Sequence, residues 1–219
     1  MIIRNLSKDD TIVDEELKKY VRRVIETLSP EQLENLQQFP GAYLSKIKDK
    51  INEFKKTYRE HRFFFLIEQN RILCEASYSF KKTISILNEE RTLQKSLYVA
   101  EDKMDISFEY SMAEFLASQK NIKWWHKNIA RTGFCINGFV NAYPDFIAMT
   151  ENGMILVIET KGDHLIENID SRHKLKIGRK WAILSGLNNY RYYMVSQNKD
   201  IGEDGAYRFD AFKKIIEGL

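Results

Sequence analysis

Residues 144–161 constrain the fold most, because two apolar runs there flank a short Glu-Asn-Gly turn and have charged residues at their ends. Ile155 to Ile158 are apolar at every position, which predicts a central strand covered on both faces. Residues two apart in a strand point to the same face, so Glu159 and Lys161 share one. A hairpin across the turn would bring Asp145 alongside them.

Charges at the end of a buried strand are unfavourable unless they are paired or bind a metal ion. Two carboxylates and one ammonium group suit a hard divalent cation and a phosphate. The alternative is an ordinary ion pair between Glu159 and Lys161, since a Glu-x-Lys triplet is frequent by chance. Pro144-Asp145 upstream and the apolar run between the charges favour the functional interpretation.

Pro144-Asp145, thirteen intervening residues and Glu159-Thr160-Lys161 resemble the signature of the PD-(D/E)XK nucleases. The segment YPDFIAMTENGMILVIETKG is similar to the C-terminal endonuclease domain of type III restriction enzyme Res subunits and related DEAD/DEAH-box helicase proteins. The resemblance covers about residues 100–197 well and is weaker upstream. It implies an α/β fold with an α-β-β-β-α-β core and a mixed central sheet, which is the restriction-endonuclease-like arrangement.

Composition sets limits on the alternatives. The 219 residues are 43% hydrophobic and carry a net charge of only +3, so a nucleic-acid contact must come from a local basic patch. Cys74 and Cys135 form no disulfide framework, and together with the lack of a signal-peptide pattern they favour a cytoplasmic protein. No apolar run is long enough to span a bilayer, so no membrane partner is expected.

The chain is predicted to have two parts, a mostly helical connector or accessory region over 1–95 and the nuclease domain over 96–219. Ser29-Pro30-Glu31-Gln32 is a helix start with a capping box, and a Lys- and Glu-rich helix is expected over 42–59. Residues 78–87 look extended, and a return to helix is expected beyond Asn88.

The second part is predicted to contain helix, strand, strand, strand, helix and strand. The first helix places Phe108, Met112, Phe115 and Leu116 on one face, with Asp105 or Ser107 as its cap. The expected ranges are 106–119, 124–130, 145–149 (with 139–143 extended before it), 154–161, 171–185 and 190–195.

The resemblance also implies roles for residues. Asp145 and Glu159 would hold Mg²⁺, for which Mn²⁺ would substitute, together with the backbone carbonyl of Thr160. Lys161 would contact the scissile phosphate and the attacking water. Glu109 matches a glutamate that often completes the metal site, and Glu114 matches an accessory position. The alternative for Glu109 is an acidic residue favoured by the dipole of a helix first turn.

The helix after the motif is basic, with six Lys or Arg and no Asp or Glu between Ser171 and Arg191. One face is predicted to bind DNA phosphates or to be simply solvated, and an opposite apolar face would hold Ile177, Trp181 and Leu184. Lys174 lies off the basic face; it is expected to reach the substrate phosphate, as a lysine at a matching place does in the type III-like domains, or else to snorkel. The basic face consists of Arg172, Lys176, Arg179 and Lys180.

Other patterns add little. His126, His164 and His173 lack zinc spacing, Asp163 and His164 could line the cleft, and Trp124-Trp125 is expected to pack in the core. No phosphate-binding Gly-x-x-x-x-Gly-Lys loop is present, so this chain is not itself an ATP-driven motor.

The expected function is that of a metal-dependent DNA endonuclease. The resemblance adds double-stranded DNA, a helicase or translocase portion and a methyltransferase or recognition subunit as partners. A homodimer would supply two active sites for cutting both strands, and the oligomeric state stays open. The alternatives are a non-catalytic DNA-binding or docking module of the same fold, and a nuclease for RNA or branched DNA.

Overall fold

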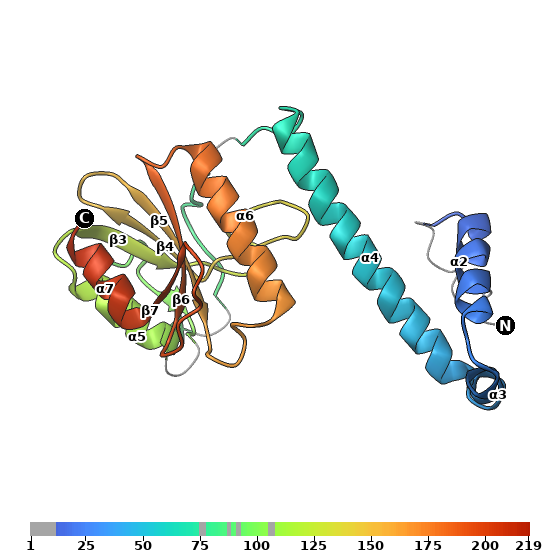
Figure 1. Ribbon diagram of the computed structural model, residues 1–219. Coiled ribbons are helices and arrows are strands. Elements are labelled where there is room, and N and C mark those ends of the chain that lie inside the picture. The colour runs from blue at the N-terminus through green and yellow to red at the C-terminus, as the bar shows by residue number, and fades with distance from the viewer. Residues whose placement is uncertain (1–11, 75–77, 87–88, 91–92, 105–107) are drawn as a thin grey trace. The chain divides into compact units, whose positions relative to one another are not determined.

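The computed structural model describes residues 12–74, 78–86, 89–90, 93–104 and 108–219. The protein is mixed α/β, with a helical N-terminal region followed by a five-stranded mixed sheet and its covering helices (Figure 1). The expected order helix-strand-strand-strand-helix-strand is confirmed. It comprises α5 (Phe108–Ser118), β3 (Ile122–Lys127), β4 (Phe146–Thr150), β5 (Ile155–Lys161), α6 (Ile169–Ser185) and β6 (Tyr190–Ser196). Two further elements, β7 (Ala206–Arg208) and α7 (Phe209–Glu217), complete it.

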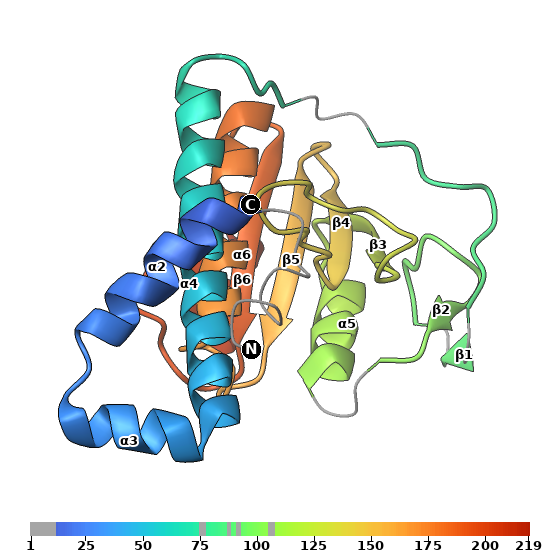
Figure 2. The same cartoon turned by 90° about the vertical axis from the view of Figure 1, so that its right-hand side faces the viewer.

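The sheet has the order β3-β4-β5-β6-β7, of which β3 to β6 are labelled in Figure 2. β3 and β5 each pair antiparallel with β4, whereas β6 pairs parallel with β5 and β7 pairs parallel with β6. The central strand is therefore β5, which has an antiparallel neighbour on one side and a parallel one on the other. Its residues Leu156 to Thr160 are all buried, as the apolar run predicted.

Helices cover both faces of this sheet. α5 and α7 pack on one face against Leu156 and Ile158, and the four residues predicted for the apolar face of α5 are all buried. α6 covers the other face, where it packs on Val157 and Tyr192. In Figure 1 the orange helix α6 runs along the sheet on the side away from α5 and α7. Because successive residues of a strand point to opposite faces of the sheet, this arrangement determines which helix each side chain at a strand end faces.

Several local predictions were wrong. The strand expected over 124–130 ends at Lys127. Of residues 139–143, only Ala142 takes part in a bridge, an isolated one with Ile136. Residues 78–86 form no strand, and the return to helix is replaced by the short antiparallel pair β1 (Glu89–Glu90) and β2 (Glu101–Asp102). Leu184 is 41% exposed instead of lying on a buried face. The cap residues Asp105 and Ser107 and the end of the expected extended piece, Leu87, lie outside the described residues.

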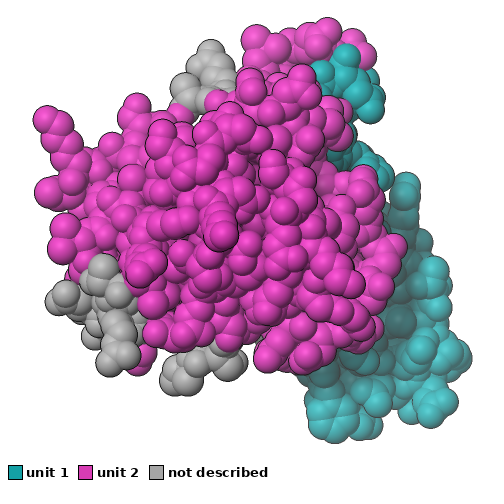
Figure 3. Space-filling model, turned by 90° about the vertical axis from the view of Figure 1, so that its left-hand side faces the viewer, with its two compact units in different colours: residues 1–68 teal, residues 69–219 magenta. Residues whose placement is uncertain are grey.

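The chain divides into two compact units, residues 1–68 and 69–219 (Figure 3). The boundary expected near residue 95 falls inside the second unit. All three tryptophans, Trp124, Trp125 and Trp181, belong to that second unit.

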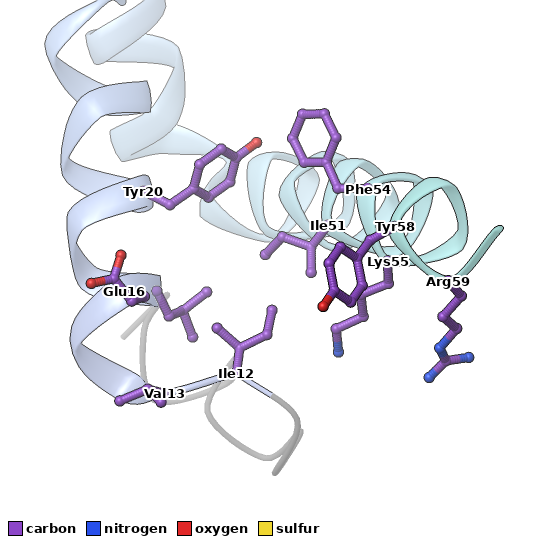
Figure 4. A pocket seen from close by; sticks show the side chains of 10 residues that line it. Ile12, Val13, Glu16, Tyr20, Ile51, Phe54, Lys55, Tyr58 and Arg59 are labelled. Carbon is purple, nitrogen blue, oxygen red and sulfur yellow. The ribbon is translucent and has the colours of Figure 1, made fainter. Parts of the chain in front are cut away.

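The first unit contains α2 (Asp14–Glu26), α3 (Pro30–Gln38) and α4 (Pro40–Glu68). The capping box is confirmed, since the Ser29 hydroxyl accepts from the Gln32 amide and the Gln32 side chain accepts from the Ser29 amide. The core is small, with Leu17, Val21 and Ile47 buried. An apolar groove of about 1000 Å³ lies between α2 and α4, and Tyr20 and Phe54 are among the residues that line it (Figure 4).

Candidate functional site

The antiparallel pairing of β4 and β5 brings Asp145 and Glu159 to the same end of the sheet. Phe146 lies opposite Ile158, so the next step of the same register sets Asp145 opposite Glu159. Residues directly opposite in an antiparallel pair share a face and lie close together. Two residues numbered far apart therefore reach one place, as the sequence predicted.

Asp145 is held firmly by the strand it faces. Its Oδ2 accepts hydrogen bonds from both the amide and the hydroxyl of Thr160, each at 2.7 Å. Its Oδ1 lies 3.5 Å from the Nζ of Lys127. One carboxylate oxygen thus fixes the orientation of Asp145, and the other is directed toward a cation.

Glu159 is deeply buried, with only 2% of its side chain exposed. Its Oε1 accepts hydrogen bonds from Lys161 at 2.5 Å and from Lys174 at 3.3 Å. Burial first, and then the negative charge of Asp145, raise the pKa of Glu159 above its ordinary value, against the opposing effect of both lysines. The cluster therefore combines two carboxylates and two ammonium groups.

The second oxygen of this glutamate is the most informative atom of the site. Among the described residues, Glu159 Oε2 and the Tyr192 hydroxyl are the two buried side-chain polar atoms with no hydrogen-bond partner. A buried carboxylate oxygen without a partner loses its hydration and receives nothing in return. A buried polar group without a protein partner in a native fold calls for an explanation, and a bound ion or water is one.

Tyr192 comes from β6, next to the central strand. Burial, followed by the charges of Glu159 and Asp145, raises the pKa of Tyr192 well above its ordinary value. The hydroxyl consequently stays protonated and is a donor near the carboxylates. Gly178 of α6 lies directly over the ring, since a Cβ at this glycine would come within 2.4 Å of it.

The close packing of α6 on β6 places Lys174 of α6 beside Glu159. Its Nζ lies 3.3 Å from Glu159 and 3.5 Å from Asp170, one turn earlier on the helix. Burial alone would lower the pKa of Lys174, but the two carboxylates outweigh burial and the pKa is raised. Lys174 therefore carries its charge beside Glu159, and its predicted contact with a substrate phosphate stays a prediction.

Glu109 reaches the site only indirectly. It lies in the first turn of α5, and its Oε1 is 2.8 Å from Lys127 Nζ. Within the described part of the chain, no three His, Cys, Asp or Glu side chains gather closely enough to hold a metal ion among themselves. Glu114 is exposed on α5.

The residues present nevertheless fit a hard divalent ion. Mg²⁺ in phosphate-processing sites uses one or two carboxylates and keeps several waters, so a set of three protein carboxylates is not required. Glu159 offers a buried oxygen with no partner, and Asp145 supplies a second carboxylate opposite it. The role of the Thr160 carbonyl stays a prediction.

The basic face of α6 is partly neutralised. Arg172 and Lys176 are exposed and Lys180 is half-buried, whereas Arg179 forms an ion pair with Asp204 at 2.8 Å. Phosphate binding by these residues stays a prediction. Asp163 has a different partner, because its carboxylate accepts from the amides of Asn198 and Lys199 and ties together two loops.

Two parts of this end of the sheet escaped the sequence analysis. Lys127 is buried at the end of β3 and contacts both Glu109 and Asp145. Glu101 is also buried, and its Oε2 lies 2.8 Å from His126 Nδ1. Lys127 follows His126 at the end of β3, and no local pattern of the sequence signalled its contacts with Glu109 and Asp145.

Comparison with protein-family models, with curated proteins and with solved structures gave no match. None of the helices in the described part of the chain is long and apolar enough to cross a membrane.

Proposed function

We propose that this protein is a metal-dependent DNA endonuclease of the PD-(D/E)XK type, with a restriction-endonuclease-like core and the nuclease role of a type III Res-like system. The observation that carries the proposal is the buried Glu159, which faces Asp145, pairs with Lys161 and keeps one oxygen without a partner. This arrangement supplies the acid pair and the ammonium group that phosphodiester hydrolysis needs.

Each residue then has a distinct task. Asp145, oriented by Thr160, and Glu159 would hold Mg²⁺ or Mn²⁺. The bound ion would polarise a phosphoryl oxygen and lower the pKa of a bound water. Lys161, held at the same strand end, would donate to the scissile phosphate and stabilise the negative charge that develops there.

Lys174 supports the same chemistry from the α6 side. Its raised pKa keeps it charged, and its side chain is about one-fifth exposed, so the ammonium group is accessible to an entering phosphate. Arg172, Lys176 and Lys180 follow along the same helix and would neutralise phosphates farther along the DNA. Duplex DNA, a translocase portion and a recognition subunit are the partners that this proposal includes.

The decisive experiment is cleavage of supercoiled plasmid in Mg²⁺ by the wild type and by Lys161→Ala. We expect the variant to keep its near-ultraviolet circular dichroism and to lose about 10²–10³-fold in rate, the usual effect of removing one transition-state donor. Lys123→Ala, on the exposed side of β3, is the matched control and should cut normally. Wild-type cleavage by Lys161→Ala would refute the proposal.

Substrate class is measured in the same assay. Duplex DNA should be cut in preference to single-stranded DNA, RNA and branched DNA, and preference for one of these would replace the DNA endonuclease by the corresponding nuclease. If the wild type cuts nothing and binds no Mn²⁺ in calorimetry, the chain is a non-catalytic module.

A further inference from the structure

Lys127 lies in an unusual position for a lysine. Only 10% of its side chain is exposed, and its Nζ is 2.8 Å from Glu109 Oε1 and 3.5 Å from Asp145 Oδ1. The same ammonium group lies 5.0 Å from the centre of the Phe146 ring. A charge buried to this degree needs such partners, and here two carboxylates supply them.

The pairing of β3 with β4 determines which face the lysine occupies. Lys127 lies opposite Phe146, so both side chains point to the face that α5 covers. Glu109 approaches from α5 on that face, whereas Glu159 shares the α6 face with Val157 and meets Lys174 there. The ammonium group of Lys127 thus contacts both Glu109 and Asp145, and on Asp145 it lies nearest the carboxylate oxygen that Thr160 does not bind.

This is the place where a second metal ion would be expected. Two-metal phosphodiesterases hold ions about 3.5–4 Å apart, with a carboxylate shared between them and further carboxylates on each. Asp145 is the candidate for the shared carboxylate and Glu109 for a ligand of the second ion. Both are already within reach of the same ammonium group, which is a fixed positive charge.

We propose that Lys127 is a built-in cation that takes the place of a second metal ion, so that the site binds one divalent ion and Glu109 is a partner of Lys127 and not a ligand. This inference rests on the proposed function and specifies it. Lys127 is a positioning residue: it contacts Oδ1 of Asp145, while Thr160 donates to Oδ2. A divalent ion between Glu109 and Asp145 would meet the ammonium group at close range and be repelled.

The test counts Mn²⁺ ions by calorimetry in the full chain, without DNA. The wild type is expected to bind one ion. Lys127→Met, which keeps the length of the side chain and removes its charge, is expected to bind two, because Glu109 and Asp145 are then released to hold the second. The double variant Lys127→Met/Glu109→Gln should return to one ion, and Lys123→Met on the same strand should behave as the wild type.

The outcomes are separable. Two ions on the wild type would overturn the inference and leave the proposed nuclease standing. No ion on the wild type would remove both. One ion on the wild type and one on Lys127→Met would show that Lys127 does not exclude the second ion.

A second measurement covers the case in which Lys127→Met does not fold because two carboxylates lose their partner. Electron paramagnetic resonance of the wild type with two equivalents of Mn²⁺ should give only the six-line signal of isolated ions. A spectrum of two exchange-coupled ions would overturn the inference, since it requires a pair of neighbouring ions in one site.

Discussion

Two regions at the margins of the central sheet each bury a glutamate, and they satisfy it in opposite ways. The side chain of Glu101, beside β3, is 1% exposed. Its Oε1 accepts a hydrogen bond from the Ser96 hydroxyl. Its Oε2 accepts one from the Lys127 amide and lies 2.8 Å from His126 Nδ1. Glu159, at the end of β5, is buried to a similar degree. Lys161 and Lys174 both donate to its Oε1, whereas its Oε2 has no hydrogen-bond partner. A buried carboxylate whose oxygens all have hydrogen-bond partners is typical of a structural role, whereas a carboxylate oxygen without a partner is able to bind a ligand.

Charge separates the two regions as well. Glu101 has one neighbouring imidazole and two neutral donors, a set that a folded chain supplies entirely from itself. Glu159 has a second carboxylate opposite it and two lysines, and burial raises its pKa. A region built for stability alone would avoid opposed carboxylates, because each disfavours the ionisation of the other. The hydrogen bonds of Glu101 are thus typical of a structural residue, whereas those of Glu159 support the ligand role that we propose for it.

The largest effect is expected for Glu159→Gln. The variant removes the open oxygen's charge, so plasmid cleavage should fall at least about 10²-fold and Mn²⁺ binding should be lost. Cleavage kinetics and calorimetry measure the two consequences. A variant that binds Mn²⁺ as tightly as the wild type would mean that Glu159 is as structural as Glu101.

The opposite pattern is expected for Glu101→Ala. The Ser96 hydroxyl, the His126 ring and the Lys127 amide would lose a buried acceptor together, so the free energy of unfolding should fall by about 3 kcal/mol. Urea unfolding followed by tryptophan fluorescence measures it, because all three tryptophans lie in the second unit. Mn²⁺ affinity should be unchanged in the folded variant; a selective loss of affinity would place Glu101 within the site.

Gly178→Ala tests how α6 reaches the Glu159 region. The added Cβ would come within 2.4 Å of the Tyr192 ring, so the helix or the ring must shift, at a loss of about 1–3 kcal/mol in the free energy of unfolding. The control is Gly41→Ala, which meets open space in α4 and should leave the tryptophan transition unchanged. Equal transitions for the two variants would contradict the close packing of α6 on β6.

Asp163→Asn is expected to have the smallest effect on stability, and the size of this effect depends on pH. The hydrogen bond from the Asn198 amide, with those of the Asn198 side chain and the Lys199 amide, lowers the pKa of Asp163 below its ordinary value of 3.8. A depressed pKa contributes stability that is fully present above 3.8 and is lost as the pH falls through the folded value. Urea midpoints of the variant and wild type should thus differ slightly at pH 7 and converge in acid; a constant difference would exclude the carboxylate charge as its cause.

The sequence predicted the elements whose signals are local. The apolar run Ile155–Ile158, the capping box at Ser29 and the four apolar residues of α5 each specify an element through neighbours within a few positions. β7 was missed because three residues, Ala206–Arg208, carry too short a pattern to recognise. Residues 78–86 have strand-like composition, yet they form no strand in the structure.

For the candidate site too, the sequence predicted the contacts that depend on local patterns. The proximity of Asp145 and Glu159 could be predicted because one hairpin register joins them, and that of Glu159 and Lys161 because they are two apart in one strand. Lys174 was singled out by the family resemblance and by its place off the basic face of the helix. Lys127 could not be found this way, since its contact with Glu109 depends on how α5 packs against the sheet. For Glu109 the sequence left two roles open, a metal ligand and an acidic residue favoured by the helix dipole, and its ion pair with Lys127 was not foreseen.

The switch from antiparallel to parallel pairing at β5 has a consequence for dynamics. With a strand on each side and helices over both faces, the amides of Val157 and Ile158 should be among the slowest in the chain to exchange with deuterium. Glu159 follows directly on this most protected segment. The fold therefore holds its carboxylate in place, so that under the proposed function it would be preorganised before substrate arrives.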